Sequence, residues 1–256
     1  MTLTTLTLQA MTMPFTVQLV PPAATPLAPR QLATYRHQIQ TALDQIDHDF
    51  SPFRPHSLVN RWASRQLTAD QLTPDFQTVY AWAIRAADVT GGAFDPFYAG
   101  RYDPTGLVKG WAIQRVFERY LRPALDQGTL QAAAINGAGD IQVGVAQGSS
   151  FRWHVGIEDP TAPRRVLATY TLQNGAVATS GTHQHGEHIR RQVPSALQQA
   201  TVVLPTLTPA DIYATAAVAM GPARFLAFSH QHHLSGLLLA TPHRVTTLEG
   251  GVAHDA

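Results

Sequence analysis

Two stretches of this chain place oxygen ligands or a cation beside the start of a predicted helix. Asp103 and Lys109 bracket a glycine-containing turn that opens one helix. A helix N-terminus and a lysine together form a favourable site for a phosphate group. Further along, Asp211 and Thr215 are four residues apart and therefore share one face of a second helix. Carboxylate and hydroxyl oxygens are hard ligands that suit Mg2+ better than a transition metal.

Both stretches also have a purely structural interpretation. Asp103 can cap a turn, and Thr208-Pro209-Ala210-Asp211 has the pattern of an N-cap followed by the first three helical positions. The capping box and the helix dipole stabilise an aspartate at the third position by about 0.5–1 kcal/mol. The chain has no Walker motif, and Gly137-Ala138-Gly139 lacks the third glycine of a dinucleotide fingerprint. Spacing alone therefore leaves both interpretations open.

Histidines form a third group of candidates. His183, His185 and His188 fall in one polar, turn-rich stretch, and a second group lies at 230–233. Three histidines in one loop are a possible zinc site, although loop histidines are commonly just solvated. A single histidine acting as a base is the better hypothesis, because imidazole has a pKa near 7 and can activate a hydroxyl nucleophile.

Hydrophobic spacing predicts the elements that position these residues. Apolar residues at intervals of three and four indicate a helix over 32–50, and Thr73-Pro74 begins another that Gly91-Gly92 ends. Two further helices are expected at 107–121 and 209–220. Strands are expected at 15–20, 131–135, 141–145, 152–157, 166–172, 201–204, 236–240 and 244–248. This partial segregation of helices and strands favours the α+β class.

Composition limits the kinds of protein that this chain can be. With 256 residues, 45% of them hydrophobic, the chain suits one large domain or two closely fused lobes. A net charge of +1 without a basic run argues against nucleic-acid binding. The absence of cysteine excludes disulfides and thiolate metal sites. With no signal-peptide pattern and no apolar run near the ~18 residues of a spanning helix, we expect a cytoplasmic protein without membrane insertion.

Seven short motifs together give the chain a resemblance that none of them gives alone. They are Phe-Ser-Pro-Phe-Arg-Pro-His-Ser at 50–57, Gly-Gly-Ala-Phe-Asp-Pro at 91–96, the stretch from Asp103 to Trp111, Asn-Gly-Ala-Gly-Asp-Ile at 136–141, Trp-His-Val-Gly-Ile-Glu-Asp-Pro at 153–160, Ala-Thr-Ser-Gly at 178–181 and Ala-Asp-Ile-Tyr-Ala-Thr at 210–215. In this order, from about Ala10 to Gly221, the sequence resembles the ApbE family of FAD:protein FMN transferases, as a short member.

The resemblance implies a fold and an activity. The fold would be one α+β domain over 1–256, with mixed or antiparallel sheets and packed helices. The activity would be Mg2+-dependent transfer of FMN from FAD to a Thr or Ser of a partner flavoprotein, with release of AMP. Two other functions use the same site. In one, water replaces the acceptor and FAD is hydrolysed to FMN and AMP, and in the other the protein binds FAD without catalysis.

The resemblance also implies roles for individual residues. Met11 and Phe53 would contact the flavin or adenine ring, and Ala93, Phe94 and Asp95 would line the FAD site. Asp103 and Lys109 would hold ribose and phosphate. Mg2+ would bind the Gly106 carbonyl and the side chains of Asp211 and Thr215. His188 would deprotonate the acceptor hydroxyl.

Overall fold

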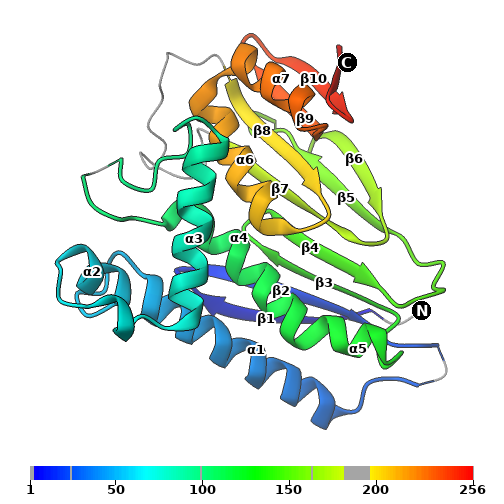
Figure 1. The fold of residues 1–256 in the computed structure, drawn as a ribbon. Coiled ribbons are helices and arrows are strands. Elements are labelled where there is room, and N and C mark those ends of the chain that lie inside the picture. Colours follow the sequence, from blue (N-terminus) through cyan, green and yellow to red (C-terminus); the bar gives the residue numbers. More distant parts are fainter. Residues whose placement is uncertain (1–2, 24, 99, 163, 182–196, 256) are drawn as a thin grey trace.

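The chain folds around one long antiparallel sheet, as a computed structural model shows (Figure 1). The structure describes residues 3–23, 25–98, 100–162, 164–181 and 197–255. Nine strands follow the order β1-β2-β3-β4-β7-β8-β9-β10-β11. They are β1 Thr4–Ala10, β2 Met13–Val20, β3 Ala132–Gly137, β4 Asp140–Val145, β7 Gly175–Gly181, β8 Leu197–Leu204, β9 Ser235–Ala240, β10 Arg244–Glu249 and β11 Val252–Asp255.

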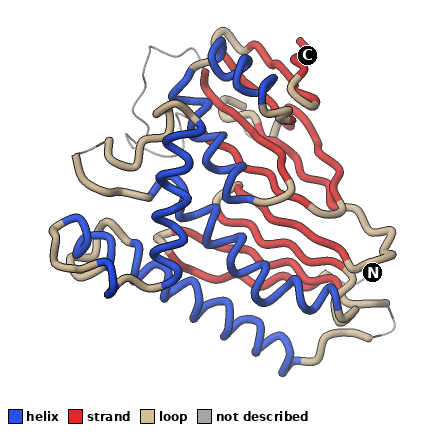
Figure 2. Tube along the Cα trace, in the orientation of Figure 1, coloured by secondary structure: helices blue, strands red, loops and turns tan. Residues whose placement is uncertain are grey.

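The helices cover one face of this sheet, as the blue and red segments of Figure 2 show. They are α1 Pro29–Phe50, α2 Leu58–Ala63, the short 3-10 helix η1 Ala69–Gln71, α3 Pro74–Val89, α4 Thr105–Val116, the π turn η2 Phe117–Leu121, α5 Arg122–Asp126, α6 Leu207–Met220 and α7 Pro222–Gln231. A second sheet consists of β5 Trp153–Glu158 and β6 Val166–Leu172. The mixture of helices with antiparallel sheets confirms the predicted single-domain α+β class.

Helices α4 and α6 form the centre of the helical layer. Eleven residues of α6 are buried, as expected for a helix that is apolar on every side. The backbone N–H and the hydroxyl of Thr208 both donate to Oε1 of Gln114 on α4, at 2.9 and 2.7 Å. These bonds fix the start of α6 against the middle of α4.

The predicted start of α6 was wrong. The helix begins at Leu207 with Thr206 as its N-cap, so Asp211 is its fifth residue and not its third. Pro209 is tolerated inside the first turn because the N–H groups of that turn have no partner within the helix. The capping interpretation of Asp211 therefore fails, and its carboxylate has a different partner.

The helix predicted at 107–121 is part of a longer helical run. It starts at Thr105, widens into a π turn at Phe117–Leu121 and continues as α5 to Asp126. Pro123 would clash with the carbonyl four residues before it in a regular helix. The π turn ends two residues before Pro123 and changes the local hydrogen-bonding pattern, which explains why the helical run does not stop at Leu121.

Side chains from α1 reach the backbone of the outermost strand β1. Nη1 of Arg36 donates to the carbonyl of Thr7 at 3.0 Å, and Nε2 of Gln40 donates to the carbonyl of Gln9 at 2.8 Å. These two contacts tie the long helix to the edge of the sheet. Within the described part of the chain, no helix has the length and apolar character needed to cross a bilayer.

Candidate functional site

A cavity of about 540 Å³ opens where the helical layer meets the β1–β2 turn. Its walls come from segments far apart in the sequence: the β1–β2 turn, the end of α1, the following loop, the first turns of α4, the end of β7, and α6. The lining residues are Met11, Thr12, Met13, Ile46, Asp47, Phe50, Ser51, Pro52, Phe53, Arg54, Thr105, Gly106, Val108, Lys109, Ser180, Gly181, Asp211 and Thr215. Six of the predicted site residues thus share one cavity.

Asp211 lies at the closest contact between α4 and α6. One of its oxygens, Oδ2, accepts the backbone N–H of Gly110 at 2.9 Å, and the side chain is buried. A Cβ atom at position 110 would lie 2.6 Å from Cβ of Asp211, which is closer than real Cβ contacts come. Only glycine at 110 lets the two helices approach this closely, and the approach sets the position of the Asp211 carboxylate.

The predicted metal ligands meet at the same point. A Cβ at Gly106 would lie 3.7 Å from Cγ2 of Thr215, so the Gly106 backbone is beside that side chain. In a regular helix the N–H of Gly110 donates to the Gly106 carbonyl, but here Asp211 also accepts from that N–H. Oγ1 of Thr215 lies 3.2 Å from Oγ of Ser180, at the end of β7.

These oxygen donors fit Mg2+ better than they fit zinc. Mg2+ usually takes one or two carboxylates and completes its octahedron with substrate phosphate and water. Asp211, Thr215 and Gly106 offer one carboxylate, one hydroxyl and one carbonyl. Among the described residues no three His, Asp or Glu side chains cluster as a metal site.

Lys109 lies next to these donors and is the only lysine in the 256-residue sequence. Its Nζ lies 2.8 Å from Oδ2 of Asp140, and their side chains are 15% and 0% exposed. Burial alone would lower the pKa of Lys109, but Asp140 and Asp211 raise it, and the net pKa is above its ordinary value. The lysine is therefore a fixed positive charge on the cavity wall.

Asp140 is a charged residue whose importance was not evident from the sequence. It starts β4, and its Oδ1 accepts the backbone N–H of Thr179 on β7 at 3.0 Å. The signal available was a carboxylate directly after the Ala138-Gly139 turn, at the start of an apolar strand. Pairing with Lys109 depends on tertiary contacts that spacing does not reveal.

The charges near Asp211 change its acidity. Burial raises its pKa most. The Asp140 carboxylate raises it further, through its charge and a side-chain hydrogen bond, whereas Lys109 and the Gly110 N–H lower it. The balance gives a pKa of about 7. Two buried carboxylates next to a single lysine carry more negative than positive charge when both are ionised, and an added cation would stabilise this arrangement.

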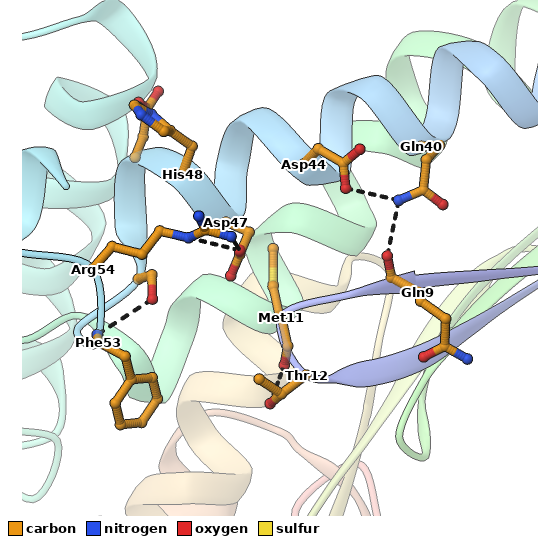
Figure 3. A network of polar contacts seen from close by, with 11 residues as sticks. Gln9, Met11, Thr12, Gln40, Asp44, Asp47, His48, Phe53 and Arg54 are labelled. Atoms are coloured by element: carbon orange, nitrogen blue, oxygen red, sulfur yellow. Dashed lines mark hydrogen bonds and ion pairs between the residues drawn. The ribbon is translucent and has the colours of Figure 1, made fainter. Parts of the chain in front are cut away.

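The mouth of the cavity carries an exposed ring and an unusual turn (Figure 3). Phe53 is 76% exposed although it is apolar. Met11 and Thr12 both have positive φ, 50° and 62°, as a two-residue hairpin turn requires, and this conformation is costly for a β-branched threonine. Arg54 is held by Asp47, with Nε and Nη2 at 3.1 and 2.6 Å from one carboxylate oxygen.

Four predicted site residues do not line the cavity. Ala93 and Phe94 are buried, and Cε2 of Phe94 would be 3.0 Å from a Cβ at Gly106, so Phe94 packs behind the metal-ligand candidate. Asp95 accepts the N–H of Phe97, and Asp103 accepts the N–H of Thr105 at 3.0 Å. The two carboxylates thus have local turn partners, and Asp103 holds the start of α4.

The histidine candidates separate into two groups. His183, His185 and His188, including the predicted base, lie outside the described residues. In the second group, the ring of His232 lies 4.2 Å from that of Phe228, and none of these histidines lines the cavity.

This fold and site define a single-domain α+β protein whose cavity sets oxygen donors beside a buried lysine. The sequence model of the ApbE family matches residues 11–101 and 99–238, which is most of the chain. The chain therefore belongs to the ApbE family. No curated protein gives a match.

Solved structures of the same family share the fold. The Pseudomonas stutzeri flavinyl transferase ApbE, in its apo form, has a TM-score of 0.77 at 17% identity, covering 96% of this chain and 95% of that one. The Vibrio cholerae flavin transferase ApbE has a TM-score of 0.73 at 18% identity, with 100% and 97% covered. The ApbE protein of Thermotoga maritima has a TM-score of 0.74 at 18% identity, with 97% of each chain covered.

Proposed function

We propose that this chain transfers FMN from FAD to a Thr or Ser of a partner flavoprotein, with Mg2+ and with release of AMP. One observation carries the proposal: Lys109 on α4 and Asp211 and Thr215 on α6 line the same cavity although about a hundred residues separate them. A buried cation beside hard oxygen ligands is what a diphosphate bridge and its metal require. Membership of the ApbE family and the flavin transferase activity named for the structural relatives add support.

The residues around the metal position would each hold one part of the substrate. Asp211, Thr215 and the Gly106 carbonyl would bind Mg2+, which when bound supplies charge neutralisation of the diphosphate and polarisation of phosphorus. The ammonium of Lys109 would donate to a diphosphate oxygen from the adjacent wall. The burial of both groups strengthens their electrostatic effect, because water screens them poorly there.

The mouth of the cavity would bind the rings of the dinucleotide. Phe53 is free to stack on a flavin or adenine ring, and Met11 would contact the ring from the β1–β2 turn. Asp95 and Asp103 would act on the site mainly through the turns they hold, and Ala93 and Phe94 through packing. In this proposal the four residues support the cavity wall, whereas the resemblance implied that they contact FAD directly.

The transfer step needs a base for the acceptor hydroxyl. The hydroxyl oxygen would form a bond to the FMN phosphorus, the bond from that phosphorus to the AMP oxygen would break, and the base would take the hydroxyl proton. His188 is proposed for this role on sequence grounds. His188→Ala should then retain FAD binding and lose transfer, and unchanged transfer would remove His188 from the mechanism.

A direct test incubates the purified protein with FAD and Mg2+, with and without candidate flavoproteins, and measures AMP by chromatography and the acceptor by mass spectrometry. We expect an acceptor mass increase matching FMN, in step with AMP release. AMP release without an acceptor would indicate hydrolysis of FAD. FAD binding without AMP under any condition would indicate a non-catalytic flavin carrier and would contradict the proposal.

A further inference from the structure

Three charged side chains meet behind the cavity wall, but only two of them face the cavity. Lys109 and Asp211 line it, whereas Asp140 does not. Among the described residues, the ion pair of Lys109 is with Asp140, at 2.8 Å, and no pair with Asp211 forms within 4.0 Å. The lysine therefore has two carboxylates within electrostatic reach and contacts the one that lies behind it.

Asp140 is well anchored for this contact. It is fully buried at the start of β4, directly after a tight turn formed by Ala138 and Gly139. The paired residues of β4 and β7 end at Ile141 and Val177, and beyond that point Oδ1 of Asp140 accepts the Thr179 N–H. One oxygen is thus bound to the sheet, and the other is directed to the ammonium.

The negative charge of Asp211 can attract either the Lys109 ammonium or a divalent cation in the cavity. Its Oδ2 is held by Gly110, and the carboxylate faces the cavity beside Thr215 and Gly106. Lys109 lowers the pKa of Asp211, so the ammonium does interact favourably with this carboxylate. An ammonium in direct contact with Asp211 would neutralise the carboxylate, and the carboxylate would then attract a divalent cation less strongly.

We propose that Asp140 is a positioning residue that keeps the Lys109 ammonium away from Asp211 and so leaves Asp211 free to bind a divalent cation. This inference rests on the proposed function, because it takes Asp211 as a metal ligand. It assigns one carboxylate to the lysine and the other to the metal. Asp140 also interacts directly with the Asp211 carboxylate, but its proposed role is to hold Lys109, and it does not line the cavity.

The substitution Asp140→Asn tests the separation of charges. Asparagine keeps an oxygen that can accept the Thr179 N–H but removes the negative charge from behind Lys109. The nearest remaining carboxylate for the ammonium is then Asp211. We expect Lys109 to pair with Asp211 in this variant and to compete with the metal. Lys109→Met in the same background removes the competitor, so metal binding should recover.

Metal binding is measured directly with Mn2+, by electron paramagnetic resonance titration in the absence of flavin. We expect Asp140→Asn to bind Mn2+ about tenfold or more weakly than the wild type, and Lys109→Met to bind it equally or more tightly. The double variant should return to within about threefold of the wild type, a non-additivity that reports a direct coupling. If the double variant binds as weakly as Asp140→Asn, Asp140 does not act through Lys109 and the inference is overturned.

The single lysine allows a second measurement that needs no variant. Amine acetylation at Lys109 is followed by peptide mass spectrometry, with and without Mn2+. In the wild type we expect Mn2+ to change the acetylation rate less than about threefold, because the ammonium is already paired with Asp140. A large Mn2+-induced increase would mean that the lysine leaves Asp211 on metal binding, which overturns the inference even if Asp140→Asn fails to fold.

These outcomes are distinguishable from failure of the proposed function. If the wild type binds Mn2+ but does not cleave FAD, the transferase assignment fails while the role of Asp140 can still be supported. If the wild type cleaves FAD and Asp140→Asn binds Mn2+ normally, only the role of Asp140 is overturned. If the wild type binds no Mn2+, both are overturned.

Discussion

Replacing Gly110 with alanine should separate activity from stability. The added Cβ would lie 2.6 Å from Cβ and 2.7 Å from Oδ2 of Asp211. Ordinary carbon contacts begin near 3.5 Å, so α4 and α6 must move apart by about 0.9 Å, or the Asp211 side chain must rotate. Either change displaces the carboxylate that we assign to the metal.

The cost in stability should be small. Overpacking of a core costs about 1–3 kcal/mol, but alanine in place of glycine within a helix returns about 1 kcal/mol. The free energy of unfolding should therefore fall by about 0–2 kcal/mol, which lowers Tm by only a few degrees in a chain of this size. A displacement near 1 Å at a catalytic group can lower the rate about 100-fold.

The assay compares Mg2+-dependent AMP release from FAD, Mn2+ affinity and Tm for Gly110→Ala and a matched control. Gly144→Ala adds a Cβ 2.8 Å from Cζ of Phe117, which does not line the cavity, and should lower Tm while retaining activity. Activity and Mn2+ affinity within about threefold of wild type in Gly110→Ala would refute the claim that the α4–α6 contact positions Asp211.

Three further predictions follow from the same contacts. Asp211→Asn should lower Mg2+-dependent FAD cleavage at least about 100-fold. Its Tm should not fall, because the substitution removes an unfavourable buried charge, and a parallel loss of Tm would favour a structural role. The metal-free wild type should lose stability relative to Asp211→Asn as pH rises from about 4 to 8, because the pKa of Asp211 is raised from 3.8 to about 7 and the protonated form is the one that folding favours. A Tm difference between these two proteins that is independent of pH would contradict this pKa. Thr73→Ala removes the hydroxyl that accepts the Phe76 N–H at the start of α3 and should cost about 1 kcal/mol in chemical denaturation, with FAD cleavage unchanged.

Local signals in the sequence were sufficient for several elements. The strand predicted at 166–172 has the bounds of β6, and Thr73 caps α3 as the Thr-Pro pattern indicated. The same pattern failed at Thr208-Pro209, because the buried Leu207 belongs to the helix and extends it backwards. Burial of Leu207 in the tertiary structure determines where α6 starts, and N-cap patterns in the sequence do not report burial.

Elements missed by the sequence analysis depend on distant partners. The strand β7 consists largely of small residues, GAVATSG, and its extended form is set by pairing with β4 and β8. The residues Lys109, Asp211 and Thr215 were expected in one site from the order of the motifs, and they do share a cavity. Asp140 was missed because its contact with Lys109 joins segments that spacing alone cannot bring together.

The contacts between α1 and β1 have a consequence for solubility. The last strand of an open sheet exposes backbone groups that can recruit a strand from another molecule and start aggregation. Arg36 and Gln40 already bind two carbonyls of β1, at Thr7 and Gln9, so an incoming strand would first have to displace them. A long nine-stranded sheet can thus end at β1 without acting as a template for self-association.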